Sequence, residues 1–459
     1  MSTISTSATT TAAPLAVRRP GGVVEVAALA YPIVLQTFSD TLMHVVDSAF
    51  VGRIGSTELG AVGFSGIWLW TFLCAFVGTA GGVQTFVAQA YGAGRERECG
   101  KWIWQALAVL LPAVVVWAAL VALVLPTLIA WLAPSAALQE RALAYAAGRF
   151  PGMPAMIGGM IVTSFFRGIG QTRVPLAATV IANLTNALLA YGLVFGRFGL
   201  PEWGVYGAGT ATSVSHWIYL TLMLGAALRP RITRVYGTAP SRPRATDVRR
   251  FLRTSTPIGG QWVLDMASFA IFSTIIARMG DLAMAANQTM IQLLSLSFMQ
   301  VYGLSIAAGA LVGRYIGARD LEAAERSYRS AMRLGLTISA LVALAFLTVP
   351  DLLLSIFTRD ESLMTLGRPV LVLGALFQIV DAVGILIAGA LRGAGDTRWP
   401  FVVQASLAWL LRLPVVYGLA VFLEGGLLGA WIGELLYLVV LAAALFHRFR
   451  SGAWRLVRV

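Results

Sequence analysis

Charged residues are scarce in this chain: Asp, Glu, Lys and Arg make up 12% of its 459 residues, whereas hydrophobic residues make up 58%. A soluble domain does not need so much apolar side chain, so the composition excludes a soluble protein and indicates one that crosses a membrane many times. A spanning helix takes about 20 residues, which leaves room for about twelve spans with short loops.

The chain has only two cysteines, Cys74 and Cys99, which excludes a disulfide framework, and we expect both to be free thiols. The sequence also lacks a zinc-ligand cluster, a phosphate-binding glycine loop and a nucleophile elbow. The DDxxD kind of Mg²⁺ motif that a membrane prenyl transferase would need is absent as well. We therefore expect a protein that is not an enzyme and has no cofactor.

The apolar stretches predict an all-α integral membrane protein with spans at 24–50, 57–88, 100–125, 142–166, 174–196, 204–228, 252–279, 282–313, 325–349, 366–391, 399–422 and 426–447. The long basic connection 229–251 divides them into an N-terminal lobe (23–228) and a C-terminal lobe (252–447) with six spans each. Residues 1–22 are rich in Ser, Thr and Ala and predict a disordered tail, and 448–459 predict a cytoplasmic tail.

A shift of 225 residues relates separate segments of the two halves (265 − 40 = 225). The matched pairs include Pro32 and Pro257, Gln36 and Gln261, Asp40 and Asp265, Gly92 and Gly317, and Arg167 and Arg392. One offset that holds across several segments indicates an internal repeat. Because each half has an even number of spans, the two halves have the same orientation, and we expect a parallel repeat about an axis along the membrane normal.

The net charge of the chain is +13, and most of its basic residues lie in every second loop between the predicted spans. Lys and Arg gather in the N-terminal tail, in loops after even-numbered spans and in the C-terminal tail, with eight Arg between Arg229 and Arg253. We therefore expect both termini in the cytoplasm, and contacts with anionic lipid but not with nucleic acid.

Three ionisable residues, Asp40, His44 and Asp47, lie in the first predicted span at i, i+4 and i+7, on one face of the helix. An ionisable group in a bilayer is costly and usually faces a protein interior or a water-filled path. We interpret this stripe as a proton or cation relay. A polar seam that only joins helices is the alternative, and for His44 ordinary packing stays equally open.

The C-terminal half has three further acids within spans, Asp265, Asp381 and Glu434. A carboxyl group that is protonated on one side and deprotonated on the other can drive alternating access, and we expect this role for Asp265 and Asp381. We interpret Glu434 as structural. Arg412 lies near the middle of a span and needs a counter-ion, for which we expect Asp381 or Asp265.

Several other side chains within the spans have amide groups, a cation, or soft and aromatic surface suited to varied ligands. We expect a substrate cavity lined by Gln36, Asn186, Gln261, Gln288, Met290, Phe377 and Arg412.

The segments PIVLQTFSDTLMHVVDSAFVGRIG, VAQAYGAGRERE, RGIGQTRVP and LRGAGDTRWP together resemble the multidrug and toxic compound extrusion (MATE) family, and the chain looks closest to its DinF-like branch. The resemblance implies a V-shaped transporter with a central cavity between two six-helix bundles. It also implies export of amphipathic, often cationic compounds in exchange for H⁺ or Na⁺. The family's functional positions match Asp40, Asp47, Asn186, Asp265 and Asp381.

Two positions depart from the family's pattern. Many relatives have an Asp where this chain has Ala190, and sodium-coupled relatives tend to have a Tyr where it has Phe377. Both departures favour H⁺ as the coupling ion, with Na⁺ at Asp265 and Asp381 left open. We expect a monomer in the cytoplasmic membrane. The alternatives are a lipid-linked oligosaccharide flippase, which would need a strongly basic cavity, a membrane enzyme and a passive channel.

Overall fold

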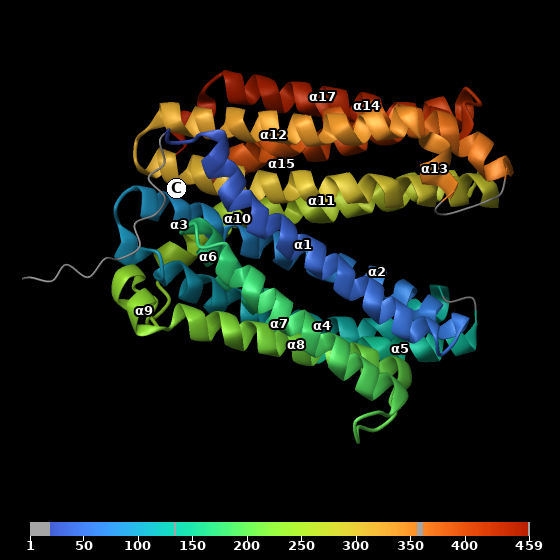
Figure 1. The fold of residues 1–459 in the computed structure, drawn as a ribbon, viewed down its shortest axis with the longest axis horizontal. Helices are drawn as coiled ribbons and strands as arrows, with labels where there is room; N and C mark the ends of the chain where they lie inside the picture. Colours follow the sequence, from blue (N-terminus) through green and yellow to red (C-terminus); the bar gives the residue numbers. More distant parts are fainter. Residues whose placement is uncertain (1–18, 133–134, 356–360, 458–459) are drawn as a thin grey trace, which may run out of the picture.

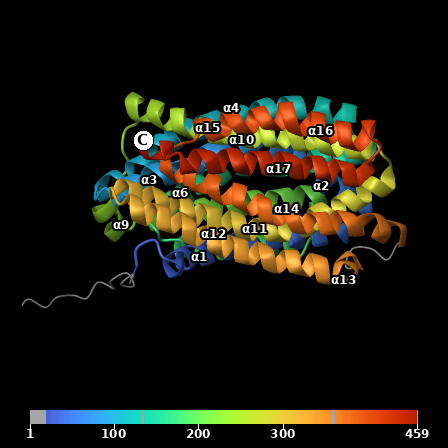
Figure 2. The ribbon, with the colours of Figure 1, turned by 90° about the horizontal axis from the view of Figure 1, so that it is seen from above.

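In the computed structural model, the described residues are 19–132, 135–355 and 361–457, and all regular elements within these ranges are helical. Figure 1 shows two bundles that meet at one end and diverge toward the other, like the arms of a V. The long helices run roughly along the longest axis of the molecule in both views (Figures 1 and 2). This arrangement confirms the expected all-α architecture of two lobes.

The N-terminal bundle consists of α1 (Val23–Gly52), α2 (Ser56–Gly81), α3 (Val83–Gly92), α4 (Lys101–Leu132), α5 (Ala136–Arg149), α6 (Met153–Gly168), α7 (Arg173–Phe195) and α8 (Gly204–Ala227). After the short helix α9 (Pro230–Tyr236), the C-terminal bundle consists of α10 (Ala245–Ala277), α11 (Asp281–Gly317), α12 (Leu321–Thr348), α13 (Pro350–Ser355), α14 (Glu361–Ala394), α15 (Arg398–Leu407), α16 (Leu413–Tyr417) and α17 (Gly426–Arg450).

Within the described ranges, 10 helices are long and apolar enough to cross a membrane, or up to 11 if the bent pair of α8 and α9 is one span. The fourth predicted span, 142–166, is broken into α5 and α6 by a short turn at Phe150–Gly152, which contains Pro151. Proline removes a backbone donor and interrupts the helix there. If α8 and the broken pair α5–α6 are each counted as one segment, the described residues form six long helical segments in each bundle, as the sequence predicts.

The two bundles are joined closely at the narrow end of the V. Gly92 lies against the carbonyl of Arg314, and its repeat partner Gly317 lies against the carbonyl of Gln89 (89 + 225 = 314). The two contacts are therefore equivalent under the internal repeat. Only glycine fits at such a close approach of two backbones, because a Cβ would overlap the facing oxygen.

Side chains of α3 add hydrogen bonds across the same narrow end. Gln84 Nε2 donates to the carbonyl of Ile306 (2.9 Å), and Thr85 Oγ1 donates to the carbonyl of Arg392 (2.8 Å). These bonds satisfy carbonyls of the C-terminal bundle from the N-terminal one, and they fix the lobes together at this end.

The ends of the predicted domains differ from the structure. Residues 1–18 of the predicted tail lie outside the described residues, but Pro20 and Gly21 accept hydrogen bonds from α12, from Arg326 (2.9 Å) and Ser330 (2.8 Å). The linker predicted at 229–251 contains α9 and the first turns of α10. In the predicted C-terminal tail, Trp454 is fully buried against Phe449, so the described residues 448–457 are part of the fold.

A prediction follows for the close contact at the narrow end. Gly92→Ala places a Cβ against the Arg314 carbonyl and should lower the free energy of unfolding by about 1–3 kcal/mol, as overpacking generally does. The measurement is the melting temperature of the purified protein. Gly63→Ala is the control, because nothing lies within 4 Å of a Cβ at Gly63. A Gly92→Ala protein that melts no earlier than the control would contradict the interpretation.

Candidate functional site

The first polar site lies inside the N-terminal bundle, where α1 packs against α7 and α8. Asp47 Oδ1 accepts a hydrogen bond from Asn186 Nδ2 (2.7 Å), and Asp47 Oδ2 accepts one from Thr212 Oγ1 (3.4 Å). Ser215 Oγ in turn donates to Asn186 Oδ1 (3.3 Å). Asp47 is 7% exposed and Asn186 is 0% exposed. This carboxyl group is thus buried and hydrogen-bonded to neutral donors.

No basic side chain of the described residues lies within ion-pair distance of Asp47. Arg149 interacts with it electrostatically at longer range. When a carboxyl group has no direct cationic partner, its protonation leaves no buried cation unpaired. An unpaired buried cation would be costly in free energy. The geometry therefore suits a site that exchanges a proton.

A second network lies about two to three turns earlier in α1, around Gln36 and Asp40. Gln36 Oε1 accepts from Arg167 Nη2 (2.9 Å), and Gln36 Nε2 donates to the hydroxyl of Tyr219 (3.2 Å). Asp40 is partly buried and interacts with Arg167 and with the side chain of Asn183. Gln36 therefore serves as a buried connection between α1, α6 and α8.

Among the described residues, no hydrogen bond of His44 connects these two networks. Its side chain is exposed, and it interacts electrostatically with Arg149 and His216. The predicted stripe on α1 thus has one buried acid, one partly buried acid and an exposed imidazole. The relay through all three residues stays a prediction.

The C-terminal bundle contains a cavity of about 370 Å³ between α10, α11, α14 and α17. Three carboxyl groups line it, those of Asp265, Asp381 and Glu434, and two guanidinium groups, those of Arg392 and Arg412. Its apolar wall is formed by aromatic side chains that include Phe269, Phe272, Phe377 and Trp431. The cavity therefore combines an excess of acid with aromatic surface, which is suited to an organic cation.

Arg412 has a different counter-ion from the expected one. Its Nε donates to Glu434 Oε2 (2.6 Å), and its Nη1 donates to Ser268 Oγ (3.0 Å). The guanidinium also lies 5.6 Å from the Phe272 ring and 5.3 Å from the Tyr437 ring. Both Arg412 and Glu434 are more than 90% buried.

The expectation that Asp265 or Asp381 pairs directly with Arg412 is therefore wrong, although Asp265 interacts with it at longer range. The physical reason is a π-helical turn at Ala408–Arg412, which widens the helix by one residue and changes the direction of the following side chains. A prediction that assumes 3.6 residues per turn places the Arg412 side chain in the wrong direction when such a turn is present.

Asp265 is held by amide groups instead. Gln261 donates to Gln404, whose side chain hydrogen-bonds to Asp265. Asp381 interacts with Asp265 and Glu434, which are acids like itself. Gln378 also lines the cavity, is 4% exposed, and has no hydrogen-bond partner on either amide atom. These groups offer free acceptors and donors to a ligand.

The other predicted site residues are distributed over different environments. Gln261, Phe377 and Arg412 line the C-terminal cavity, whereas Gln36 and Asn186 lie in the networks of the N-terminal bundle. Met290 is 3% exposed and packs in an apolar core cluster, and Gln288 is exposed, so neither lines this cavity. No group of three His, Cys, Asp or Glu side chains in the described part of the chain is placed to hold a metal ion. Binding of Na⁺ at Asp265 and Asp381 stays a prediction.

Two arginines between the bundles, the buried Arg167 and the partly buried Arg392, were not predicted from the sequence. By the predicted spans, Arg167 and Arg392 fall in loops after even-numbered spans and count among the charges that set topology. Both line a pocket between the bundles instead, and Arg167 is only 8% exposed. The shift of 225 residues that relates them was a signal that they occupy matching places. Arg149, near Asp47 and His44, was also assigned to no site.

Comparison with known proteins identifies the class. The MatE family model matches residues 32–192 and 257–418, so it matches each half once, with starts 225 residues apart (257 − 32 = 225). Among curated relatives, "Probable multidrug resistance protein NorM" from Xanthomonas axonopodis pv. citri is 30% identical over 432 residues, covering 93% of this chain and 94% of the relative. "Multidrug resistance protein MdtK" from Edwardsiella ictaluri is 28% identical over 438 residues, covering 92% and 94%.

Solved structures support the fold at lower identity. "Crystal structure of MATE in the bent conformation" superposes with a TM-score of 0.85 at 18% identity, covering 94% of this chain and 96% of that one. "Outward-facing conformation of a multidrug resistance MATE family transporter of the MOP superfamily" gives a TM-score of 0.85 at 19% identity, covering 95% and 97%.

The fold and the buried polar sites define a multi-pass membrane transporter. The chain belongs to the MatE family, which confirms the resemblance in the sequence motifs. Its assignment to the DinF-like branch stays a prediction, because the relatives described above have the names NorM and MdtK.

A prediction concerns the ion pair of the C-terminal cavity. Arg412→Gln leaves Glu434 buried and unpaired, and Glu434→Gln does the same to Arg412, so each should cost about 3–5 kcal/mol of stability. The double variant strands no charge and should be less destabilised than the two single losses combined. Thermal unfolding of the four proteins in one detergent measures the coupling. Losses that simply add would show that the pair is not coupled.

Proposed function

We propose that this transporter exports amphipathic, often cationic organic compounds across the cytoplasmic membrane of a bacterium in exchange for protons. The observation that carries the proposal is the environment of Asp47. Its carboxyl group is buried, and its hydrogen-bond donors among the described residues, Asn186 and Thr212, are neutral. The names of the relatives, which describe multidrug resistance proteins, support the export of varied compounds.

In the proposed mechanism, protons enter from the wide end of the V and bind the N-terminal cluster of Asp40, His44 and Asp47. Protonation of Asp47 removes the charge that Asn186 and Thr212 hold, and α1 rearranges about Pro32, where the helix lacks a backbone donor. The lobes then rock about the segment that joins them, and the hold on a cationic substrate is weakened.

The substrate is proposed to bind partly in the C-terminal cavity. Asp265 and Asp381 supply negative charge there, and the aromatic side chains supply a wall with which an apolar cation can interact. Arg412 neutralises Glu434, which leaves Asp265 and Asp381 to interact with the cargo or with the coupling ion. A flippase for a lipid-linked diphosphate would need the opposite charge in this cavity.

The coupling ion is proposed to be H⁺, with Na⁺ as the second candidate. Phe377 lines the cavity without a side-chain oxygen that a hard cation could use. The basic residues near the narrow end are consistent with termini in the cytoplasm and a wide end open to the outside. We propose a monomer, because each bundle supplies its own polar site.

The proposal predicts how purified protein in liposomes responds to imposed gradients. Vesicles loaded with acid should accumulate a cationic dye such as ethidium, because protons leaving the vesicle drive its entry. Asp47→Asn cannot gain a proton at this site and should reduce pH-driven uptake at least about tenfold. Asp351→Asn is the control, since the Asp351 side chain is 55% exposed.

Two outcomes would contradict this account. Asp47→Asn that keeps full pH-driven uptake would exclude the proton site at Asp47. Wild-type vesicles loaded with Na⁺ at equal pH on both sides that accumulate the dye, while acid-loaded vesicles do not, would replace H⁺ with Na⁺.

A further inference from the structure

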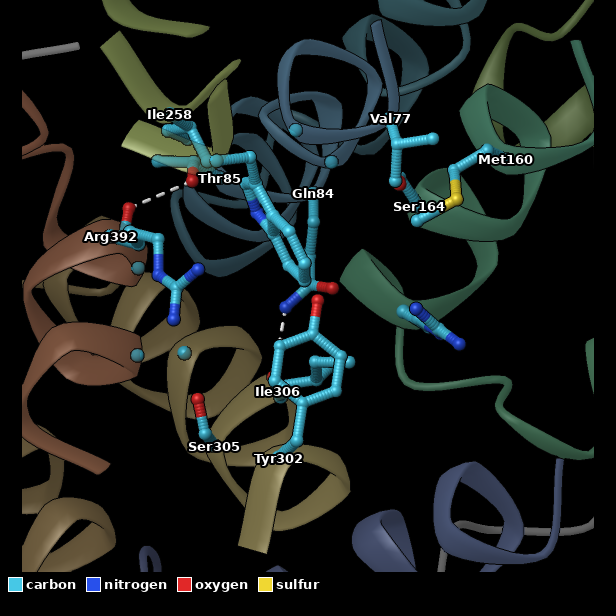
Figure 3. A pocket seen from close by; sticks show the side chains of 17 residues that line it. Val77, Gln84, Thr85, Met160, Ser164, Ile258, Tyr302, Ser305, Ile306 and Arg392 are labelled. Carbon is cyan, nitrogen blue, oxygen red and sulfur yellow. Dashed lines mark hydrogen bonds between the residues drawn. The ribbon is translucent and has the colours of Figure 1, made fainter. Parts of the chain in front are cut away.

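A pocket of about 70 Å³ lies between the bundles at the narrow end of the V, next to the C-terminal cavity, with which it shares Trp262, Tyr302 and Arg392. It is lined by α2, α3 and α6 of the N-terminal bundle and by α10, α11 and α14 of the C-terminal bundle. Figure 3 shows that Arg392, Gln84 and Tyr302 point toward one another in this pocket. A water molecule needs about 10–15 Å³ of such cavity volume, so the pocket has room for a small group of several atoms.

The pocket has two cationic side chains and no carboxylate among its lining residues. Arg167 comes from the end of α6 and Arg392 from the end of α14, at positions related by the internal repeat (392 − 167 = 225). No salt bridge in the described part of the chain includes either arginine.

The charge of Arg392 is compensated less well than that of Arg167. Among the described residues, the hydrogen bond recorded for the Arg392 guanidinium runs from Nε to the carbonyl of Ala388 (3.2 Å), and the ionisable group interacting with it is Tyr302. Arg167 donates to Gln36 and interacts with Asp40. Asp40 can therefore offset part of the charge of Arg167, but not that of Arg392.

Unpaired donors face the same space. Arg167 Nε and Ser305 Oγ are buried without a hydrogen-bond partner, and Ser305 is 1% exposed. The hydroxyl of Tyr302 points to the middle of the pocket (Figure 3). Buried donors without acceptors are costly, and two like charges facing one small space repel each other. An oxyanion would provide acceptors and negative charge together, and arginine forks bind carboxylate and phosphate groups well.

We propose that this pocket binds an oxyanion, the phosphate or carboxylate group of a small molecule or of a lipid, between Arg392 of one bundle and Arg167 of the other. Tyr302 and Ser305 donate further hydrogen bonds to it. Because the two arginines belong to different bundles, the bound anion joins the lobes at the narrow end and stabilises the form that is closed there. The lining residues of the pocket do not include Asp47, Asp265 or Asp381, the carboxyl groups proposed to hold the proton or the exported compound.

The test uses the full chain purified in detergent, with two phosphate probes. Inorganic phosphate is titrated at constant ionic strength, and short-chain phosphatidic acid is titrated separately, with diacylglycerol as the lipid without a phosphate. The melting temperature should rise saturably with at least one phosphate probe. Arg392→Gln should weaken the apparent affinity at least about tenfold, because it removes the charged fork.

Arg398→Gln is the matched control, since it removes one positive charge from an exposed position six residues further along. It should bind the probes like the wild type. Saturation by inorganic phosphate identifies a site for a free oxyanion, whereas saturation by phosphatidic acid alone identifies a lipid headgroup. If Arg392→Gln does not fold, Arg392→Lys keeps the charge without the planar fork and should bind more weakly.

The proposal is overturned if neither probe raises the melting temperature saturably. It is also overturned if the Arg392 variant that folds binds phosphate as tightly as the wild type, or if Arg398→Gln loses binding to the same extent. Failure of proton coupling in liposomes would leave these results unchanged, so the two proposals are tested separately.

Discussion

A charged side chain surrounded by apolar helices must find its compensation within the protein, and this constraint organises both bundles. Asp47 is hydrogen-bonded to Asn186 and Thr212, which are neutral, whereas Glu434 is paired with Arg412. The two solutions have different consequences. Asp47 can take up a proton and leave only neutral hydrogen-bond partners behind. Glu434 cannot do so without leaving a buried guanidinium unpaired, which suits a permanent structural pair.

The first helix connects the two bundles physically. At its start, Glu25 accepts hydrogen bonds from Tyr315 of α11 (2.7 Å to Oε2), and near its end Asp47 is bound by α7 and α8. Pro32 lies between these anchors. A change in the protonation of Asp47 therefore acts on a helix whose other end is fastened to the opposite lobe. The narrow end, with its glycine contacts and its arginine pocket, is where such a movement meets resistance.

The sequence was sufficient for the spans, the two lobes and the repeat, because apolar runs and a constant offset are properties of the chain itself. The family resemblance related Asp265, Asp381 and Phe377 to a possible Na⁺ site, and all three line the C-terminal cavity. The sequence could not reveal the partner of Arg412, since a π-helical turn breaks the regular spacing. It also misjudged Arg167, because a basic residue at the end of a span has the same pattern whether it faces water or a buried pocket.

The central claim is that buried carboxyl groups hold either a proton or a cationic cargo. The most direct measurement is the release of protons when a cationic substrate is added to the detergent-solubilised protein in a weakly buffered solution with a pH indicator. The account predicts saturable proton release by the wild type, and little release by a variant in which Asp47, Asp265 and Asp381 are all amides. Substrate binding without any release of protons across the range from weakly acidic to weakly basic pH would contradict it.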